Sequence, residues 1–292
     1  MNVELRHLRA LAAIGDEGSI TGAAAVLRVS QPALSRTLEQ LEQRMGAQLV
    51  ERTTRRLALT PAGLRLSEHA HRILTQLDDA LAEVAAGPRP LRVGFAWAAL
   101  GAYTVRLLRD WRFDRPDVPL QVHRLDDPGA ALRRGEIDVA FLRALPQDDR
   151  GGPELAVLPL YSEPRIAALC EDDPLAARDE VALGDLADRT VVLCATAATT
   201  SAALWPARRR PAATFEVANV DEWLTAIATG EAVGVTAQAT RHSHPHPGVR
   251  YLPLTDAAPV TVHFLAPATP THPATEAFRR HAHSSLPTGA GG

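Results

Sequence analysis

The segment from Ser19 to Gly46 reads SITGAAAVLRVSQPALSRTLEQLEQRMG, and it decides the fold of the N-terminal part of the chain. Ser19 is a good helix N-cap residue, and the small residues Ala23 and Ala24 that follow it let a second helix approach closely. After a three-residue turn, Ser30 provides the cap of the next helix. The segment therefore predicts two short helices joined by a tight turn.

A hydrophobic stripe indicates the buried face of the second of these helices. Its members recur at spacings of four, three and four residues: Leu34, Leu38, Leu41 and Met45. The N-terminal end of the same helix keeps its remaining side chains for the surface: Gln31, Ala33, Ser35, Arg36 and Thr37. An earlier helical pattern over Leu5–Ile14, followed by Gly15 and Gly18, adds a third helix in front of the pair.

A basic hairpin and a long helix follow. Short apolar segments, Leu49-Val50 and Leu57–Leu59, flank Glu51–Arg56, which predicts a hairpin with a basic tip. Thr60 and Pro61 then begin a helix that runs to about Ala86, where Gly87-Pro88 stops it, and such a helix is roughly 40 Å long. One apolar stripe follows its whole length: Leu66, Ala70, Ile73, Leu77, Leu81 and Val84. Because nothing in a small domain can cover all of it, we expect the stripe to pack against a second copy of the chain.

The composition favours a globular cytoplasmic protein. Of the 292 residues, 46% are hydrophobic and 22% are charged, with a net charge of -3. No run of about 18 apolar residues occurs, and charged residues near the N-terminus replace the apolar core of a signal peptide, so no membrane is expected. Every basic residue other than histidine is arginine. Cys170 and Cys194 are interpreted as buried thiols in preference to a redox switch.

Beyond Pro90, predicted strands alternate with helices, which is typical of an α/β domain. The strand predictions are 91–96, 120–124, 137–142, 155–160, 165–170, 191–194, 215–218, 233–237 and 260–264. Helices are predicted up to Phe113, over Pro128–Arg134 and over Thr275–His283. The last residues, 287–292, are small and polar.

The chain resembles the LysR-type transcriptional regulators over some sixty N-terminal positions. The resemblance is carried by Leu5–Arg9, Gly18–Thr21, Ala23-Ala24, Val29–Ser35, Leu41-Glu42, Glu51-Arg52 and Leu59–Gly63, with a weaker match at Gly135–Ala140. Many residue types recur there in order, which makes the match specific.

This resemblance implies an α+β multidomain fold. We expect a winged helix-turn-helix DNA-binding domain over residues 1–60, a linker and dimerisation helix over 61–88, an effector-binding domain over 89–286 and a flexible tail over 287–292. The effector-binding domain would be a two-lobed α/β unit like that of periplasmic binding proteins, with lobe 1 at 89–161 and 259–286 and lobe 2 at 162–258. The implied partners are double-stranded DNA, a small-molecule effector, further copies in a homodimer or homotetramer, and RNA polymerase; no other cofactor is implied.

The family pattern also implies residues that contact DNA. Gln31, Pro32, Ser35 and Arg36 would enter the major groove, where Gln31 and Arg36 read bases. Phosphate contacts fall to Ser19, Thr21 and Ser30 and to the wing, namely Arg52, Thr53, Thr54, Arg55 and Arg56. The alternative is that the serines only cap helices and the arginines form a solvated surface; the set as a whole favours DNA.

The effector is expected between the lobes, at the carboxyl ends of strands. The candidate residues are Trp97, Ala98, Ala99, Arg143, Thr196, Thr199 and Thr236. Many relatives have a serine or threonine after the first strand to hold an effector carboxylate, where this chain has Trp97-Ala98-Ala99, so an anionic effector is less expected. Arg143 is the candidate counter-charge. Trp97 either stacks on a ligand or packs in the core, and the threonines have turn or cap roles as their alternative.

Three rival functions are weaker. His242, His244 and His246 suggest a metal site, but the prolines between them favour a surface loop, and no metal is predicted. No nucleophile elbow, phosphate loop or dinucleotide fingerprint occurs, so catalytic residues and enzyme activity are not predicted. A solute-binding protein without a DNA role would explain the C-terminal two thirds but not the N-terminal pattern.

For the favoured function, we expect regulation to follow from a change in lobe closure on effector binding, which would change the placement of paired DNA-binding domains.

Overall fold

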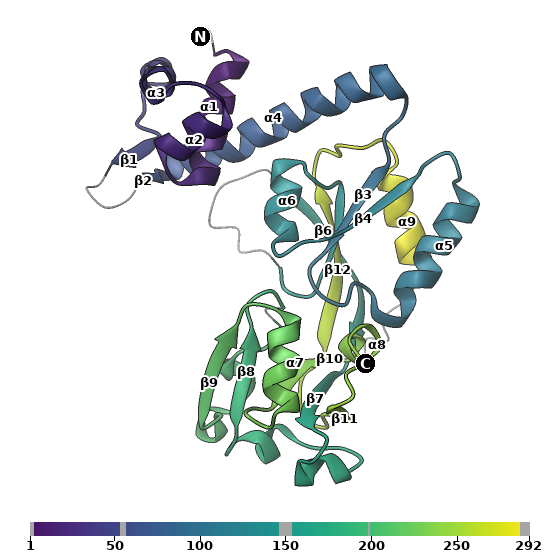
Figure 1. Cartoon of the computed structure of the whole chain (residues 1–292). Coiled ribbons are helices and arrows are strands. Elements are labelled where there is room, and N and C mark those ends of the chain that lie inside the picture. Colours follow the sequence, from purple (N-terminus) through teal and green to yellow (C-terminus); the bar gives the residue numbers. More distant parts are fainter. Residues whose placement is uncertain (1–2, 53–56, 146–153, 198, 287–292) are drawn as a thin grey trace.

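The computed structural model describes residues 3–52, 57–145, 154–197 and 199–286. Figure 1 shows a small helical domain at the N-terminus, a long helix α4 that leads away from it, and two α/β lobes. The α+β multidomain fold expected from the sequence is present.

Three helices and a two-stranded hairpin form the N-terminal domain: α1 Leu5–Glu17, α2 Ile20–Val26, α3 Gln31–Met45, β1 Val50–Arg52 and β2 Leu57–Leu59. Ser19 caps α2 and Ser30 caps α3, each by accepting a hydrogen bond from a backbone N–H three residues later. Gly46 ends α3 with a left-handed backbone at φ 64°. Leu34, Leu38 and Leu41 are buried, but Met45 is 39% exposed, so the expected buried stripe stops one turn early because α3 extends past the core.

The apolar stripe predicted along helix α4 (Pro61–Ala86) has two parts with different surroundings. Its first part packs into the N-terminal domain, where Ala70 is fully buried and Leu66 lies against the core. Gly63 is required at this contact, because a Cβ there would lie 2.0 Å from the Leu49 carbonyl oxygen. The second part is open, and Leu81 is 62% exposed within the chain.

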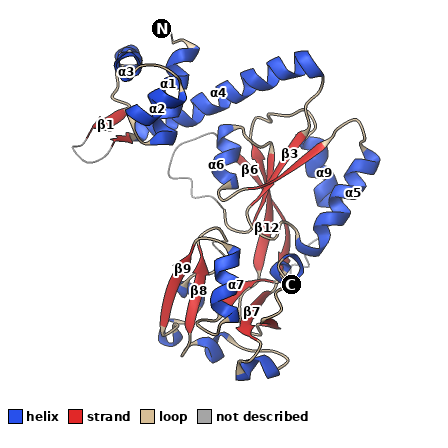
Figure 2. Ribbon diagram, viewed as in Figure 1, coloured by secondary structure: helices blue, strands red, loops and turns tan. Residues whose placement is uncertain are grey.

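A five-stranded sheet in the order β4-β3-β5-β12-β6 forms lobe 1. Its strands are β3 Leu91–Phe95, β4 Leu120–Arg124, β5 Val139–Leu142, β6 Leu155–Glu163 and β12 Val260–Pro267. The helices α5 Thr104–Asp114 and α9 Thr275–Ser285 cover one face, and α6 Pro128–Arg134 covers the other (Figure 2). Strands β3, β4 and β5 are parallel, so their carboxyl ends meet at one edge of the sheet.

Two small sheets, β10-β7-β11 and β8-β9, form lobe 2. The elements are β7 Arg165–Cys170, β8 Thr190–Cys194, β9 Ala213–Val217, α7 Val220–Ala228, β10 Gly234–Ala237, α8 Ala239–Ser243 and β11 Val249–Pro253. Strand β11 was not predicted. The proposed histidine loop is also partly wrong, because His242 belongs to α8 and only the residues after Ser243 form a loop. The chain passes between the lobes at Pro164 and again between β11 and β12.

Ion pairs join α4 to lobe 1. Asp79 of α4 lies 2.9 Å from Arg92 Nη2 and 3.2 Å from Arg89 Nε. Both arginines also contact the buried carboxylate of Asp138, Arg89 at 2.7 Å. Asp79 thus ties the C-terminal half of the long helix to the start of lobe 1.

Candidate functional site

The N-terminal end of α3 presents the side chains expected to contact DNA. Gln31, Pro32 and Arg36 are exposed, and Ser35 is half-buried on the inner side of the same turn. No acidic residue lies in the first turn of α3, so the partial positive charge of the helix end is not neutralised locally. This end of the helix has the exposure and the electrostatics that a phosphate backbone needs.

The two other groups of predicted DNA contacts lie on neighbouring elements. Thr21 is exposed in the first turn of α2, whereas the Ser19 hydroxyl is engaged as the cap of that helix, 3.0 Å from the Gly22 N–H. The Ser30 hydroxyl is likewise engaged as the cap of α3, 3.4 Å from the Ala33 N–H. The hairpin is formed as expected, with Val50 opposite Leu59 and Arg52 opposite Leu57. The predicted contacts Thr53, Thr54, Arg55 and Arg56 lie outside the described residues.

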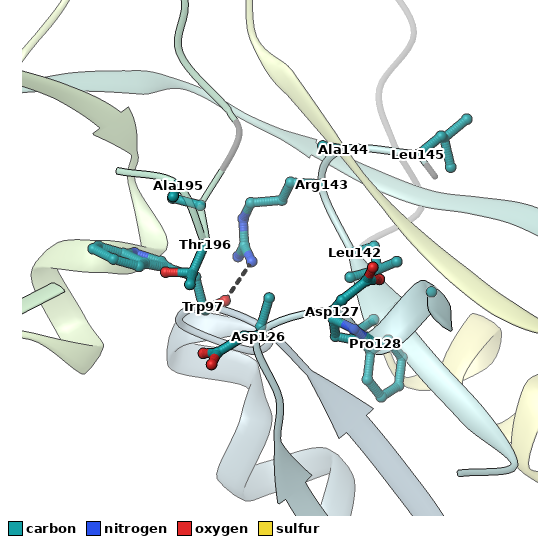
Figure 3. A pocket seen from close by; sticks show the side chains of 14 residues that line it. Trp97, Asp126, Asp127, Pro128, Leu142, Arg143, Ala144, Leu145, Ala195 and Thr196 are labelled. Atoms are coloured by element: carbon teal, nitrogen blue, oxygen red, sulfur yellow. Dashed lines mark hydrogen bonds between the residues drawn. The ribbon is translucent and has the colours of Figure 1, made fainter. Parts of the chain in front are cut away.

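A cavity of about 270 Å³ lies where the carboxyl ends of the parallel strands of lobe 1 face lobe 2. Trp97 follows β3, Asp126 and Asp127 follow β4, and Arg143 follows β5. Thr196, which follows β8, lines the cavity from lobe 2. This is the position in which open α/β sheets hold ligands. Figure 3 shows the Arg143 side chain between the Thr196 segment and the turn that carries Asp126 and Asp127.

Arg143 is buried at this cavity and makes three hydrogen bonds. Its Nε donates to Glu163, and its Nη1 donates to the carbonyl oxygens of Trp97, at 3.1 Å, and Ala99, at 2.8 Å. Glu163 also accepts a bond from the Ala239 N–H at the start of α8 in lobe 2. Arg143 and Glu163 therefore connect the cavity wall to both lobes. Among the described residues, nothing accepts a bond from Nη2 of Arg143.

The Trp97 indole packs in the core of lobe 2. Only 6% of the residue is exposed, its ring lies edge-on to Trp223 at 5.8 Å, and Nε1 donates to Thr240 Oγ1 at 2.8 Å. The His244 ring lies 5.2 Å from it, and burial lowers the pKa of His244. Trp97 thus reaches the cavity wall while its ring serves as a contact between lobes.

The other predicted effector residues are divided between two places. Ala98 and Ala99 are buried in the turn after β3, at φ 49° and 36°, and do not line the cavity. Thr199 and Thr236 line a separate hollow of about 10 Å³, too small for a ligand, and the Thr236 hydroxyl is 2.8 Å from that of Thr240. Of the three threonines, the structure brings only Thr196 to the cavity beside Arg143.

Sequence reasoning missed three acidic residues at this site: Asp126, Asp127 and Glu163. For Asp127 the sequence did hold a signal, because an aspartate before a proline, directly after a predicted strand, is typical of a helix N-cap. In the structure Asp127 caps α6, and its Oδ1 accepts a hydrogen bond from the Ala130 N–H at 2.8 Å. Within the described part of the chain, no group of three or more histidine, cysteine, aspartate or glutamate side chains is placed to hold a metal. None of the described helices is long and apolar enough to cross a membrane.

Comparison with known proteins agrees with both halves of the chain. Residues 5–64 match the model of the bacterial regulatory helix-turn-helix protein, lysR family, and residues 86–287 match the LysR substrate binding domain. The uncharacterized HTH-type transcriptional regulator YnfL of Escherichia coli K12 is 38% identical over 203 residues, which cover 66% of each protein. BenM of Acinetobacter baylyi, an HTH-type transcriptional regulator, is 27% identical over 277 residues, 90% of each protein.

Among solved structures, CbnR, a LysR family transcriptional regulator, has a TM-score of 0.65 at 20% identity and covers 97% of this chain and 99% of its own. That likeness concerns the fold alone. Four curated relatives at 35% to 38% identity are matched over only 56% to 66% of their own lengths. The substrate-binding model nevertheless matches more than half of this chain. The chain belongs to the LysR family of bacterial transcriptional regulators.

Proposed function

We propose that this chain is a sequence-specific, DNA-binding transcriptional regulator whose activity is modulated by a small-molecule effector bound at the Arg143 cavity. The observation that carries the DNA role is the end of α3, where Gln31 and Arg36 are exposed on a capped helix whose first turn holds no acidic residue. Arginine and glutamine are side chains that read base edges in the major groove. A regulator of transcription acts in the cytoplasm, and contact with RNA polymerase is part of the proposal.

The proposed assembly is a homodimer or a tetramer built from it. The open part of the α4 stripe supports pairing of two linker helices, because Ile73, Leu81 and Val84 are 45%, 62% and 90% exposed in one chain. Paired helices would place two copies of α3 for neighbouring half-sites on DNA.

The proposed coupling runs from the cavity through Glu163 to both lobes. An effector bound at Arg143 changes the hydrogen bonding of its guanidinium group. The carboxylate of Glu163 pairs with this group and also accepts a hydrogen bond from the start of α8 in lobe 2. Lobe 1 in turn holds α4 through Asp79. Effector binding that changes lobe closure therefore changes the placement of the DNA-binding domains.

Selection of bound genomic fragments with purified protein tests the DNA role. Wild type is expected to enrich a dyad-symmetric site, and Arg36→Ala is expected to lose about 1–3 kcal/mol of discrimination at the bases it contacts. Arg106→Ala, which removes an exposed arginine of lobe 1, is the matched control and should enrich the same site as wild type. If wild type enriches no site, or Arg36→Ala enriches the wild-type site equally well, the DNA-reading role of α3 is wrong.

A further inference from the structure

Two N–H groups of a buried guanidinium at the cavity have no acceptor among the residues that the structure describes. Arg143 has a side chain that is 4% exposed, and its Nε and Nη1 are engaged by Glu163 and by two backbone carbonyl oxygens. Nη2 makes no hydrogen bond to any described residue. Leaving a buried charged donor without a partner is costly, and such groups in native proteins call for a specific explanation. A ligand oxygen in the adjacent cavity would supply the acceptor.

Carboxylates outnumber cations among the described charged side chains that line the cavity. Glu163 already neutralises Arg143, and two further carboxylates, Asp126 and Asp127, line the same cavity. Arg124 lies 3.9 Å from Asp126, but both side chains are exposed to water, which weakens the pair. A ligand that carried only a carboxylate would find one free donor, Arg143 Nη2, and no use for the two aspartates, whereas a ligand with an added amine could use both.

Two backbone N–H groups in the turn after β3, next to the cavity, are already engaged within the chain. In the turn after β3, the Leu100 N–H donates to Thr104 Oγ1 at 3.1 Å and the Gly101 N–H donates to the Ala98 carbonyl oxygen at 2.7 Å. The carbonyl oxygens of Trp97 and Ala99 point toward Arg143. These N–H groups are thus used within the chain, and the turn presents acceptors to the site.

We infer that the effector is a small amphoteric metabolite of the amino-acid class, with a protonated amine facing Asp126 and Asp127 and a carboxylate or carbonyl oxygen on Arg143 Nη2. The amine meets the two carboxylates, and the oxygen satisfies the buried donor. The cavity of about 270 Å³ lies just below the roughly 300 Å³ at which ordinary ligand pockets begin, which fits a compact metabolite. This inference rests on the proposed effector role of the cavity.

Calorimetric titration of the full-length protein tests the class of ligand. The probes are the twenty proteinogenic amino acids, each alone, and then the deaminated acid and the decarboxylated amine of the tightest binder. At least one amino acid is expected to bind, with both matched derivatives at least tenfold weaker. If no amino acid binds, or if the deaminated acid binds as tightly as its parent, the amino-acid class is wrong.

Variants assign the contacts. Asp126→Asn with Asp127→Asn removes both charges, and asparagine still caps α6, so the parent amino acid should lose at least tenfold in affinity while the deaminated acid does not. Asp172→Asn, an exposed aspartate of lobe 2, is the control and should bind as wild type. Arg143→Gln combined with Glu163→Gln replaces the buried pair by neutral side chains, and it should reduce the parent's affinity to that of the amine. Unchanged affinity in either double variant contradicts the inference.

Binding to the selected DNA site in the same preparations separates this inference from the proposed function. Retained DNA binding with a failed amino-acid titration overturns only the ligand class. Loss of both the DNA site and all ligand binding in wild type overturns the regulator role as well.

Discussion

Asp138 shows how one carboxylate can order a junction of three segments. It lies directly before β5, and its side chain is fully buried. It accepts hydrogen bonds from Arg89 at 2.7 Å, from the Arg92 N–H at 2.9 Å and from the Thr271 hydroxyl at 2.7 Å. Burial raises the pKa of this carboxyl, but these donors outweigh burial and lower the pKa to about 2. The ionised form is therefore the one that the fold stabilises.

Replacing Asp138 by asparagine should lower the free energy of unfolding by about 3 kcal/mol at pH 7, because two arginines lose a buried counter-charge. The folded pKa lies below the ordinary value of 3.8, so the stabilisation by ionised Asp138 is complete above about pH 5 and is lost as the pH falls toward 2. Urea unfolding of wild type and variant at pH 7, 5, 4 and 3 measures this.

Glu154→Gln changes an exposed carboxylate directly before β6; it is the control and should unfold like wild type. The difference in unfolding free energy between wild type and Asp138→Asn should shrink as the pH falls below 5. A difference that stays constant from pH 7 to pH 3 would show that ionisation of Asp138 is not what stabilises this junction.

At the scale of helices and strands, local signals in the sequence determined what could be predicted. Ser19, Ser30 and Thr60 each cap a helix as expected, because a cap needs only neighbouring residues. Strand β11 was missed because Arg250 and Pro253 interrupt its apolar pattern, and its stability comes from pairing with β7. Helix α8 is short and lacks a side-chain cap, so it had no signal to find.

In the candidate site, too, local features could be predicted from the sequence and contacts between distant residues could not. Arg143 could be proposed from its place after a strand, because strand ends in α/β sheets converge. The pairing of Arg143 with Glu163 and the packing of Trp97 against lobe 2 join residues far apart in the chain. The spacing of residues in the sequence does not reveal such long-range contacts. Only the structure therefore shows which charged side chains surround the cavity.

The open part of the α4 stripe carries a prediction about assembly. Ile73→Arg with Leu81→Arg places two charges on the exposed apolar face and should prevent pairing of linker helices. Light scattering at micromolar concentration should then show lower mass than wild type, and affinity for the selected DNA site should fall at least tenfold, since one half-site remains per molecule.

Ala82→Arg is the matched control for this experiment, because Ala82 is exposed on another side of α4 and does not belong to the stripe. It should keep the mass and the DNA affinity of wild type. Equal mass for all three proteins would mean that the assembly does not depend on this face of α4.

In the whole molecule, α4 packs against both α1 of the N-terminal domain and α6 of lobe 1, and Asp79 is its main ionic contact with the sheet. The side chain of Asp79 is 23% exposed, and those of Arg89 and Arg92 are 9% and 14% exposed. Salt screens such partly buried pairs less than surface pairs. The contact therefore suits the proposed transmission of movement from the two lobes to the N-terminal domain.

Asp79→Ala should loosen the sensor lobes from the linker helix without unfolding either, because Arg89 and Arg92 keep Asp138 as a partner. We expect faster backbone amide exchange across residues 86–92 and a larger radius of gyration in solution scattering, with affinity for the selected DNA site within about twofold of wild type. Asp78→Ala is the control, since Asp78 is exposed on the neighbouring position and gains the same helix propensity from alanine. If both variants exchange and scatter alike, Asp79 does not hold the lobes, and the proposed coupling has to rest on the packing of α4 on α6 instead.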